Sequence, residues 1–198
     1  MKRLIAVTIV AASLVFMAGC VSKLLYNKTL PEIKAPADKA LCVIIRPTAF
    51  MGSDFVPIYC DQKYVGATEG NTMLTFDVEP GEHYIIGNAT NKSKAKFNFV
   101  AGKIYFIFHT VVTVRQSIGP ATVTIVTSTF ASSDGESAMK KIESEKGKIT
   151  WVQKNPEDKD SKDLDAKDFE DVKKDYATWA GEAKNAEEAK KEAEYPGY

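Results

Sequence analysis

The chain has 198 residues, which is enough for one domain of about 100–130 residues with extensions. Its 26 basic and 26 acidic residues balance to a net charge of zero, which argues against a nucleic-acid-binding protein with a strongly basic surface. The charge is unevenly distributed, because residues 153–198 carry 14 acidic and 9 basic side chains, a net of −5, and residues 1–152 carry +5.

The amino-terminal segment predicts export. Lys2 and Arg3 form a short positive head, residues 4–17 are apolar or weakly polar, and small residues precede Cys20. A positive head, an apolar run of roughly 7–15 residues and a small-residue cleavage site describe a secretory signal peptide. The run is too short for a spanning helix, which needs about 20 apolar residues. We therefore expect residues 1–19 to be a signal peptide.

The end of this segment, Met17-Ala18-Gly19-Cys20, resembles the lipobox of bacterial lipoproteins, although Met17 replaces the usual Leu. The resemblance implies cleavage before Cys20, a diacylglycerol thioether on its sulfur, and a palmitate or similar chain on the new amino terminus. Two or more acyl chains anchor a protein stably, whereas one binds only reversibly. The residues after Cys20 are Val21-Ser22, without an Asp. In such lipoproteins this implies transport to the outer membrane, where the protein would face the periplasm. The alternative is an ordinary cleaved signal with an unrelated cysteine.

Residues 20–39 contain Pro31 and Pro36 and alternate poorly, so they predict a linker between the lipid anchor and a folded domain. Residues 40–130 then carry strand signals at intervals of roughly 8–12 residues, which predicts a mainly β domain. We expect an antiparallel β-sandwich of about 7–8 strands, or a barrel as the alternative. The first strand, 40–46, is almost continuously apolar and should be buried on both faces. The predicted strands are 40–46, 55–60, 64–68, 72–78, 83–88, 94–100, 104–115 and 121–129.

Two cysteines remain after Cys20, and an oxidising compartment permits a disulfide between them. If residues 41–46 and 55–60 pair as a hairpin, Cys42 lies opposite Cys60. Opposed Cβ atoms lie about 4.5–5.5 Å apart, close to the separation of about 3.5–4.5 Å that a bridge needs. The alternative is two buried thiols that act as small apolar groups.

Three short pieces of the β region carry a second resemblance. They are Tyr64-Val65-Gly66, residues 78–84 (VEPGEHY) and residues 101–106 (AGKIYF). Their order resembles the uncharacterised, PEGA-like β-sandwich domain of bacterial envelope lipoproteins. The resemblance covers about residues 40–115, under half of the chain, and implies a sandwich fold. It implies no catalytic residues, because none is established for that family.

Residues 131–152 predict a short helix and a docked extension. Ser133 and Glu136 have the spacing of a capping box, in which Ser133 would be the N-cap. The side chains expected to be buried on this helix are Ala138, Met139 and Ile142. Residues 149–152 predict a last strand or an extension that packs on the domain.

Residues 153–198 predict a charged helical tail that begins near Asn155-Pro156, with residues 194–198 unstructured. Its apolar positions follow a heptad spacing typical of a packed seam. The seam residues are Phe169, Val172, Tyr176 and Trp179. Three alternatives remain: the seam docks on the sandwich, it binds a partner helix or other envelope protein, or the tail stays largely solvated.

The sequence predicts no catalytic site, metal or cofactor. His83 and His109 lie on predicted strands, away from any cluster with metal-ligand spacing along the chain. The chain lacks a glycine-rich phosphate loop and a Gly-x-Ser-x-Gly elbow. We therefore predict a non-catalytic, lipid-anchored envelope protein with a binding or structural sandwich domain. The alternatives are an accessory subunit of an envelope complex, recruited through the carboxy-terminal helix, and an enzyme.

Overall fold

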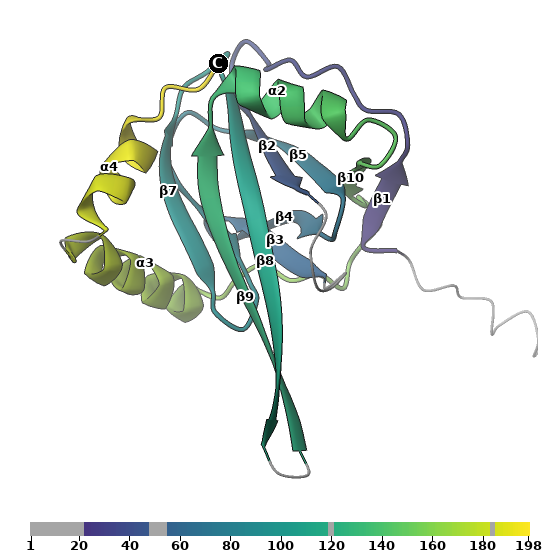
Figure 1. Cartoon of the computed structure of the whole chain (residues 1–198). Helices are drawn as coiled ribbons and strands as arrows, with labels where there is room; N and C mark the ends of the chain where they lie inside the picture. Colours follow the sequence, from purple (N-terminus) through teal and green to yellow (C-terminus); the bar gives the residue numbers. More distant parts are fainter. Residues whose placement is uncertain (1–21, 48–54, 119–120, 183–184) are drawn as a thin grey trace, which may run out of the picture.

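The computed structural model describes residues 22–47, 55–118, 121–182 and 185–198 (Figure 1). The predicted signal peptide and Cys20 lie outside the described residues. Within the described part, ten strands form a six-stranded and a four-stranded sheet that share one apolar core. The expectation of a mainly β sandwich with carboxy-terminal helices is confirmed, with more strands than the 7–8 predicted.

The six-stranded sheet has the order β1-β10-β5-β2-β8-β9. Its strands are β1 (Leu24–Asn27), β10 (Thr150–Lys154), β5 (Thr72–Val78), β2 (Ala40–Arg46), β8 (Ile104–Ile118) and β9 (Ala121–Ser133). Two of its pairs, β2–β8 and β10–β5, are parallel, whereas the sequence predicted antiparallel pairing throughout. Between β2 and β8 the chain forms β3 and β4 of the other sheet, returns as β5, and forms β6 and β7 of the other sheet. This long connection brings β8 in parallel to β2.

The four-stranded sheet has the order β4-β3-β6-β7 and is antiparallel throughout. Its strands are β3 (Val56–Cys60), β4 (Lys63–Thr68), β6 (Gly81–Gly87) and β7 (Ser93–Phe99). The edge strands β7 and β9 of the two sheets lie in contact. Next to this contact Thr90, in the segment between β6 and β7, donates its backbone N–H to the Val126 carbonyl of β9 at 3.0 Å. This junction positions the groove described below.

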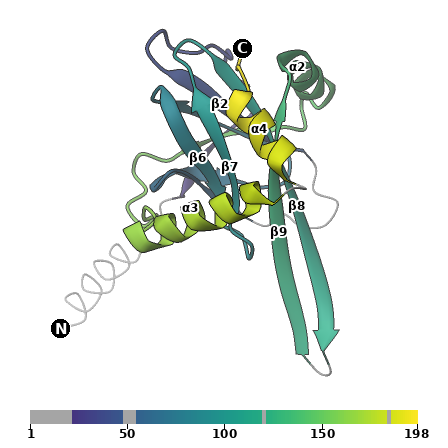
Figure 2. The ribbon, with the colours of Figure 1, turned by 90° about the vertical axis from the view of Figure 1, so that its left-hand side faces the viewer.

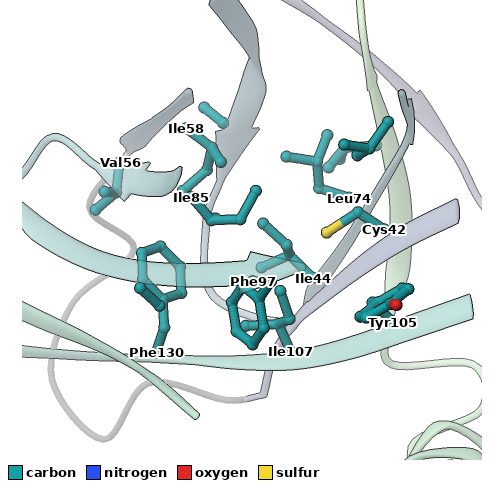
Figure 3. Packing of buried hydrophobic residues seen from close by; sticks show 14 of the residues in the cluster. Cys42, Ile44, Val56, Ile58, Leu74, Ile85, Phe97, Tyr105, Ile107 and Phe130 are labelled. Carbon is teal, nitrogen blue, oxygen red and sulfur yellow. The ribbon is translucent and has the colours of Figure 1, made fainter. Parts of the chain in front are cut away.

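The core lies between the sheets (Figure 3). Ile44 and Ile107 from the six-stranded sheet meet Ile58, Ile85 and Phe97 from the other sheet. All seven residues of β2 are buried, because its alternate side chains face this core and the helix on the outer face. The prediction of a strand buried on both faces is confirmed.

In the described part of the chain, three helices lie outside the sheets: α2 (Gly135–Ser144), α3 (Ala166–Gly181) and α4 (Ala186–Glu194). The α2 helix covers the outer face of the six-stranded sheet with Ala138 and Ile142 (Figure 1). The α3 helix covers the outer face of the four-stranded sheet with Val172, and α4 lies along β7 (Figure 2). Each outer face therefore has its own helical cover.

The boundaries of the helices differ from the predicted ones. The N-cap of α2 is Asp134, not Ser133, since the Asp134 carboxylate accepts the Ser137 backbone N–H at 2.7 Å. Met139 is 45% exposed, so its expected burial is wrong, because the apolar stripe of α2 is centred on Ala138 and Ile142. The tail helix begins only after its cap at Asp165, well beyond Asn155-Pro156.

Part of the predicted linker belongs to the domain. Leu24–Asn27 pairs with β10 as β1, and the Leu24 side chain is buried in the core. Leu30 and Ile33 pack against the outer face of the six-stranded sheet. The prediction of a linker over residues 20–39 is therefore wrong for these residues. Prolines ruled out a helix there but not a short edge strand.

Residues 195–198 are also ordered, contrary to prediction. The Tyr195 ring packs 5.4 Å from the Tyr105 ring. Tyr198 and Ile104 exchange two backbone hydrogen bonds, which tie the segment to the start of β8. Gly197 permits this approach, because a Cβ there would lie 2.7 Å from the Tyr105 ring and its φ is +63°. These four closing residues thus form a strap over the core.

Beyond the sandwich, β8 and β9 continue as a projecting two-stranded arm (Figures 1 and 2). Val112, Val114 and Val123 on the arm are 50%, 47% and 41% exposed. Val114 is paired with Ile125, and Val112 with Thr127, so the exposed valines share one face with Ile125. The opposite face is buried where the arm leaves the sandwich, since Thr113 is 5% exposed and its partner Val126 packs against the core.

Candidate functional site

The two cysteines are placed differently from the predicted hairpin. Strand β2 pairs with β5 and β8, and β3 pairs with β4 and β6, so the expected hairpin is wrong. Cys42 lies opposite Phe76 and Tyr105, and Cys60 lies opposite Ile85. Both are free thiols that border the same core from opposite sheets. Burial raises the pKa of Cys60 to about 12 and raises that of Cys42 well above its ordinary value, so both are protonated thiols.

The seam of the carboxy-terminal helix lies mostly against the domain itself. Val172 is buried, and the rings of Phe169 and Tyr176 meet Tyr84 of β6 edge-on at 5.9 and 5.4 Å. The docking alternative is confirmed for these three residues. Trp179 is only partly buried, 5.4 Å from the Tyr176 ring, and borders a groove. A partner-binding role for the seam, still a prediction, therefore depends on Trp179.

This groove has a volume of about 670 Å³ and lies where β7 and β9 meet under α3 and α4. Trp179 and Phe130 provide its aromatic surface, and Asn91 and Ser128 provide amide and hydroxyl groups. Asn91 is fixed in place, because its Nδ2 donates to the Ser128 carbonyl at 3.0 Å and its Oδ1 accepts the Ser128 N–H at 2.8 Å. An aromatic face with fixed polar groups beside it suits a ligand that has one apolar face and polar edges.

Charged side chains join the two sides of the groove. Lys92 Nζ lies 2.8 Å from Asp168 Oδ1, and Lys94 Nζ lies 3.4 Å from Asp175 Oδ2, so α3 is tied to β7 and the segment before it. Both pairs are partly exposed and contribute little to stability on their own. The rim of the groove therefore carries both positively charged ammonium groups and negatively charged carboxylates.

Glu192 lies at the base of the groove, and its side chain is buried although it carries an ionisable group. Only 5% of the residue is exposed. Its carboxyl accepts the Tyr176 hydroxyl at 2.9 Å and the Lys96 backbone N–H at 3.3 Å. Burial raises the pKa of Glu192 to about 7 despite these two hydrogen bonds. The carboxyl that holds α4 against α3 and β7 is therefore close to half protonated at neutral pH.

A second polar group is enclosed between the sheets. His109 is fully buried and stacks on Phe130 at 4.7 Å, and its Nδ1 lies 2.8 Å from the Thr68 hydroxyl. Arg46 Nη1 donates to the Thr68 carbonyl at 2.9 Å. Burial, with Arg46 nearby, lowers the pKa of His109 to about 3, so the imidazole is neutral. On its predicted strand His109 faces the interior, where its neutral ring packs on Phe130.

A third group, which the sequence did not reveal, gathers Cys60, Asp61 and His83. One donor atom from each lies within 4.8 Å of the other two. Asp61 follows Cys60 directly, but His83 comes from β6 and reaches them because β3 pairs with β6. Spacing along the chain could not bring these residues together, since that pairing crosses two intervening strands. The expectation for His83 concerned spacing along the chain, and the structure adds a grouping in space that this spacing does not show.

Comparisons with protein-family models, with curated proteins and with solved structures found no match to this chain. The resemblances noted in the sequence therefore stay predictions. Among the helices that the structure describes, none has both the length and the apolar character needed to span a bilayer. A functional assignment must come from the residues of the chain itself.

Proposed function

We propose that this protein is a non-catalytic, lipid-anchored protein of the cell envelope, in which the sandwich domain binds a ligand in the groove between β7, β9, α3 and α4. The observation that carries the proposal is the Met17-Ala18-Gly19-Cys20 motif, placed directly after a positive head and an apolar run. The anchor would be acylated Cys20, and the outer membrane, facing the periplasm, is its proposed site.

The start of the fold supports a position directly at the lipid surface. Strand β1 begins at Leu24, so the residues that join it to Cys20 reach at most roughly 14 Å when extended. Lys23 and Lys28 flank this strand, and basic side chains near a membrane are attracted to anionic lipids. The edge of the six-stranded sheet formed by β1 would then face the membrane.

The groove supports a binding role. It combines the partly exposed ring of Trp179 with the fixed amide of Asn91 and with charged groups on both rims. We propose a polar ligand with one apolar face that stacks on Trp179. The alternative, an accessory subunit recruited through the carboxy-terminal helix, would use the same residue, since Phe169, Val172 and Tyr176 pack on the domain.

Anchoring is tested with the full chain expressed in bacteria that are fed labelled palmitate. We expect the label on the wild-type protein and recovery of that protein with membranes. Cys20→Ser should lose the label and leave the membrane fraction, whereas the matched variant Cys42→Ser should keep both. A Cys20→Ser protein that stays membrane-bound, or an unlabelled wild type, would refute the lipid anchor.

The groove is tested by cross-linking the full chain in intact envelopes and then identifying what is bound. Trp179→Ala should lose the cross-linked species, and Met139→Ala, which changes an exposed residue on the opposite cover, should keep it. A bound small molecule favours the binding role, and a bound protein favours the accessory role. Equal recovery from both variants would rule out the groove for either role.

A further inference from the structure

Cys60, Asp61 and His83 form a compact set of sulfur, oxygen and nitrogen donors at the end of the four-stranded sheet. Cys60 ends β3, Asp61 begins the turn to β4, and His83 lies on the adjacent β6. The His83 side chain is 21% exposed and that of Asp61 is 34% exposed. The set is thus held by strand pairing and remains open to solvent.

Backbone contacts fix the carboxylate before any ligand binds. Asp61 has φ +54°, a left-handed conformation that Asp tolerates better than most residues. Its N–H donates to the Tyr84 carbonyl at 2.8 Å, and its Oδ1 accepts the Tyr84 N–H at 2.9 Å. The second oxygen, Oδ2, lies 2.6 Å from His83 Nδ1. The turn therefore orients both the carboxylate and the imidazole.

These distances fit a zinc ion. Zinc binds thiolate sulfur at about 2.3 Å and imidazole nitrogen or carboxylate oxygen at about 2.0–2.2 Å, in a tetrahedron whose N and O ligands lie about 3.3 Å apart. The donors already lie within 4.8 Å of one another. Widening the 2.6 Å contact between His83 and Asp61 by less than about 1 Å would admit the ion.

We propose that Cys60, Asp61 and His83 bind one Zn²⁺ ion through the Cys60 sulfur, a carboxylate oxygen and an imidazole nitrogen. The Cys60 thiol releases its proton to solvent as the sulfur binds the metal. Three protein ligands leave the fourth tetrahedral position to water or to a further ligand. Cys42 is the matched control, since it is the other thiol bordering the core but does not belong to this donor set.

The test uses the full chain with Cys20→Ser, so that only Cys42 and Cys60 can supply a thiol. Metal-free protein is titrated with Co²⁺, and a sulfur-to-cobalt charge-transfer absorption should appear and saturate at one ion per chain. Zn²⁺ should then displace Co²⁺ and remove the band. Failure of the parent protein to develop this absorption would refute the site without the use of any variant.

Four variants locate the ligands. Cys60→Ser should abolish the charge-transfer band, and Asp61→Asn and His83→Gln should weaken Co²⁺ binding by about tenfold or more. Cys42→Ser should keep the band and the affinity. Retention of the band in Cys60→Ser, or its loss in Cys42→Ser, would overturn the assignment. Zn²⁺ should also raise the Tm of the parent protein. An equal rise in the Tm of Cys60→Ser would count against Cys60 as a zinc ligand.

Discussion

The two helical covers of the sandwich begin alike and pack differently. Asp134 and Asp165 each accept a backbone N–H at 2.7 Å at the start of α2 and α3. Beneath α2, however, the six-stranded sheet offers mostly aliphatic side chains, such as Val43 and Ile45. Beneath α3, the four-stranded sheet offers aromatic rings, such as Tyr84. The α2 helix therefore packs on a mostly aliphatic layer, whereas the α3 helix packs through edge-on contacts between aromatic rings.

The difference bears on the groove beside α3. Aliphatic side chains attract without direction, and α2 packs on its sheet through Ala138 and Ile142. Aromatic rings meet edge-on, and their polar ends need partners, such as the Tyr176 hydroxyl bound to Glu192. The α3 cover therefore includes a buried ionisable group and an open side at Trp179.

The largest effect is expected at the aromatic cover. Tyr176→Ala should lower the free energy of unfolding by about 3–5 kcal/mol, because it removes a buried ring and leaves Glu192 without its hydroxyl donor. Urea denaturation of the full chain measures this loss. The control Tyr176→Phe keeps the ring and should cost only about 0.5–1.5 kcal/mol. Similar losses for the two variants would mean that the hydroxyl, not the ring, holds α3.

A smaller loss is expected at the aliphatic cover. Ile142→Ala should lower the free energy of unfolding by about 2–4 kcal/mol, because Ile142 fills the layer between α2 and the sheet. Thermal or urea unfolding measures it. Met139→Ala, on the exposed side of α2, should stay within about 0.5 kcal/mol of wild type. An equal loss of unfolding free energy in Met139→Ala and Ile142→Ala would contradict the assignment of Ala138 and Ile142 as the buried side of α2.

Only the aromatic cover should respond to pH near neutrality. The folded pKa of Glu192 is raised to about 7 from its ordinary 4.5, so between these values the folded state holds a proton that the unfolded chain has released. The contribution of Glu192 to the free energy of unfolding is therefore largest below about pH 4.5, and it is lost as the pH rises through 7. Allowing for screening by solvent, we expect a change of about 1–2 kcal/mol.

Glu192→Gln removes this proton equilibrium and keeps an acceptor for Tyr176. The measurement is the difference in unfolding free energy between wild type and variant at about pH 5 and about pH 8. As the pH rises, the unfolding free energy of the variant should increase relative to that of the wild type. A difference that does not change with pH would show that Glu192 is ionised in the folded state throughout this range.

The smallest effects should be equal in the two covers. Asp134→Ala and Asp165→Ala should each cost about 1 kcal/mol, since each removes a side-chain acceptor at a helix start. The unfolding midpoint in urea measures both. A much smaller loss of unfolding free energy in one of the two variants would show that packing holds that helix in place without its N-cap.

Local patterns predicted local structure well. The continuous apolar run of residues 40–46 predicted a strand buried on both faces, and the heptad spacing identified Val172 and Tyr176 as buried. The cap of α2 was missed by one residue, because Ser133 and Asp134 are both good N-caps. The strand at residues 24–27 was missed, because so short a segment carries no periodicity that marks it as part of a sheet.

The candidate sites depend on pairings that the sequence does not specify. The groove needs β7 beside β9, and the Cys60, Asp61 and His83 set needs β3 beside β6. Alternating hydrophobicity shows which face of a strand is buried but not which strand lies next to it. The assumed neighbours of 41–46 and 55–60 were wrong for this reason, and the predicted disulfide register depended on them.

The strap of residues 195–198 has a consequence for how the protein matures. Its bonds to Ile104 and its packing on Tyr105 join segments that are far apart in the chain, and contacts of this kind form late in folding. A polypeptide delivered amino end first would keep the Tyr105 ring and the space beside Gly135 uncovered until Tyr198 arrives. The contacts that the strap makes with Ile104 and Tyr105 are therefore completed only once residues 195–198 are in place.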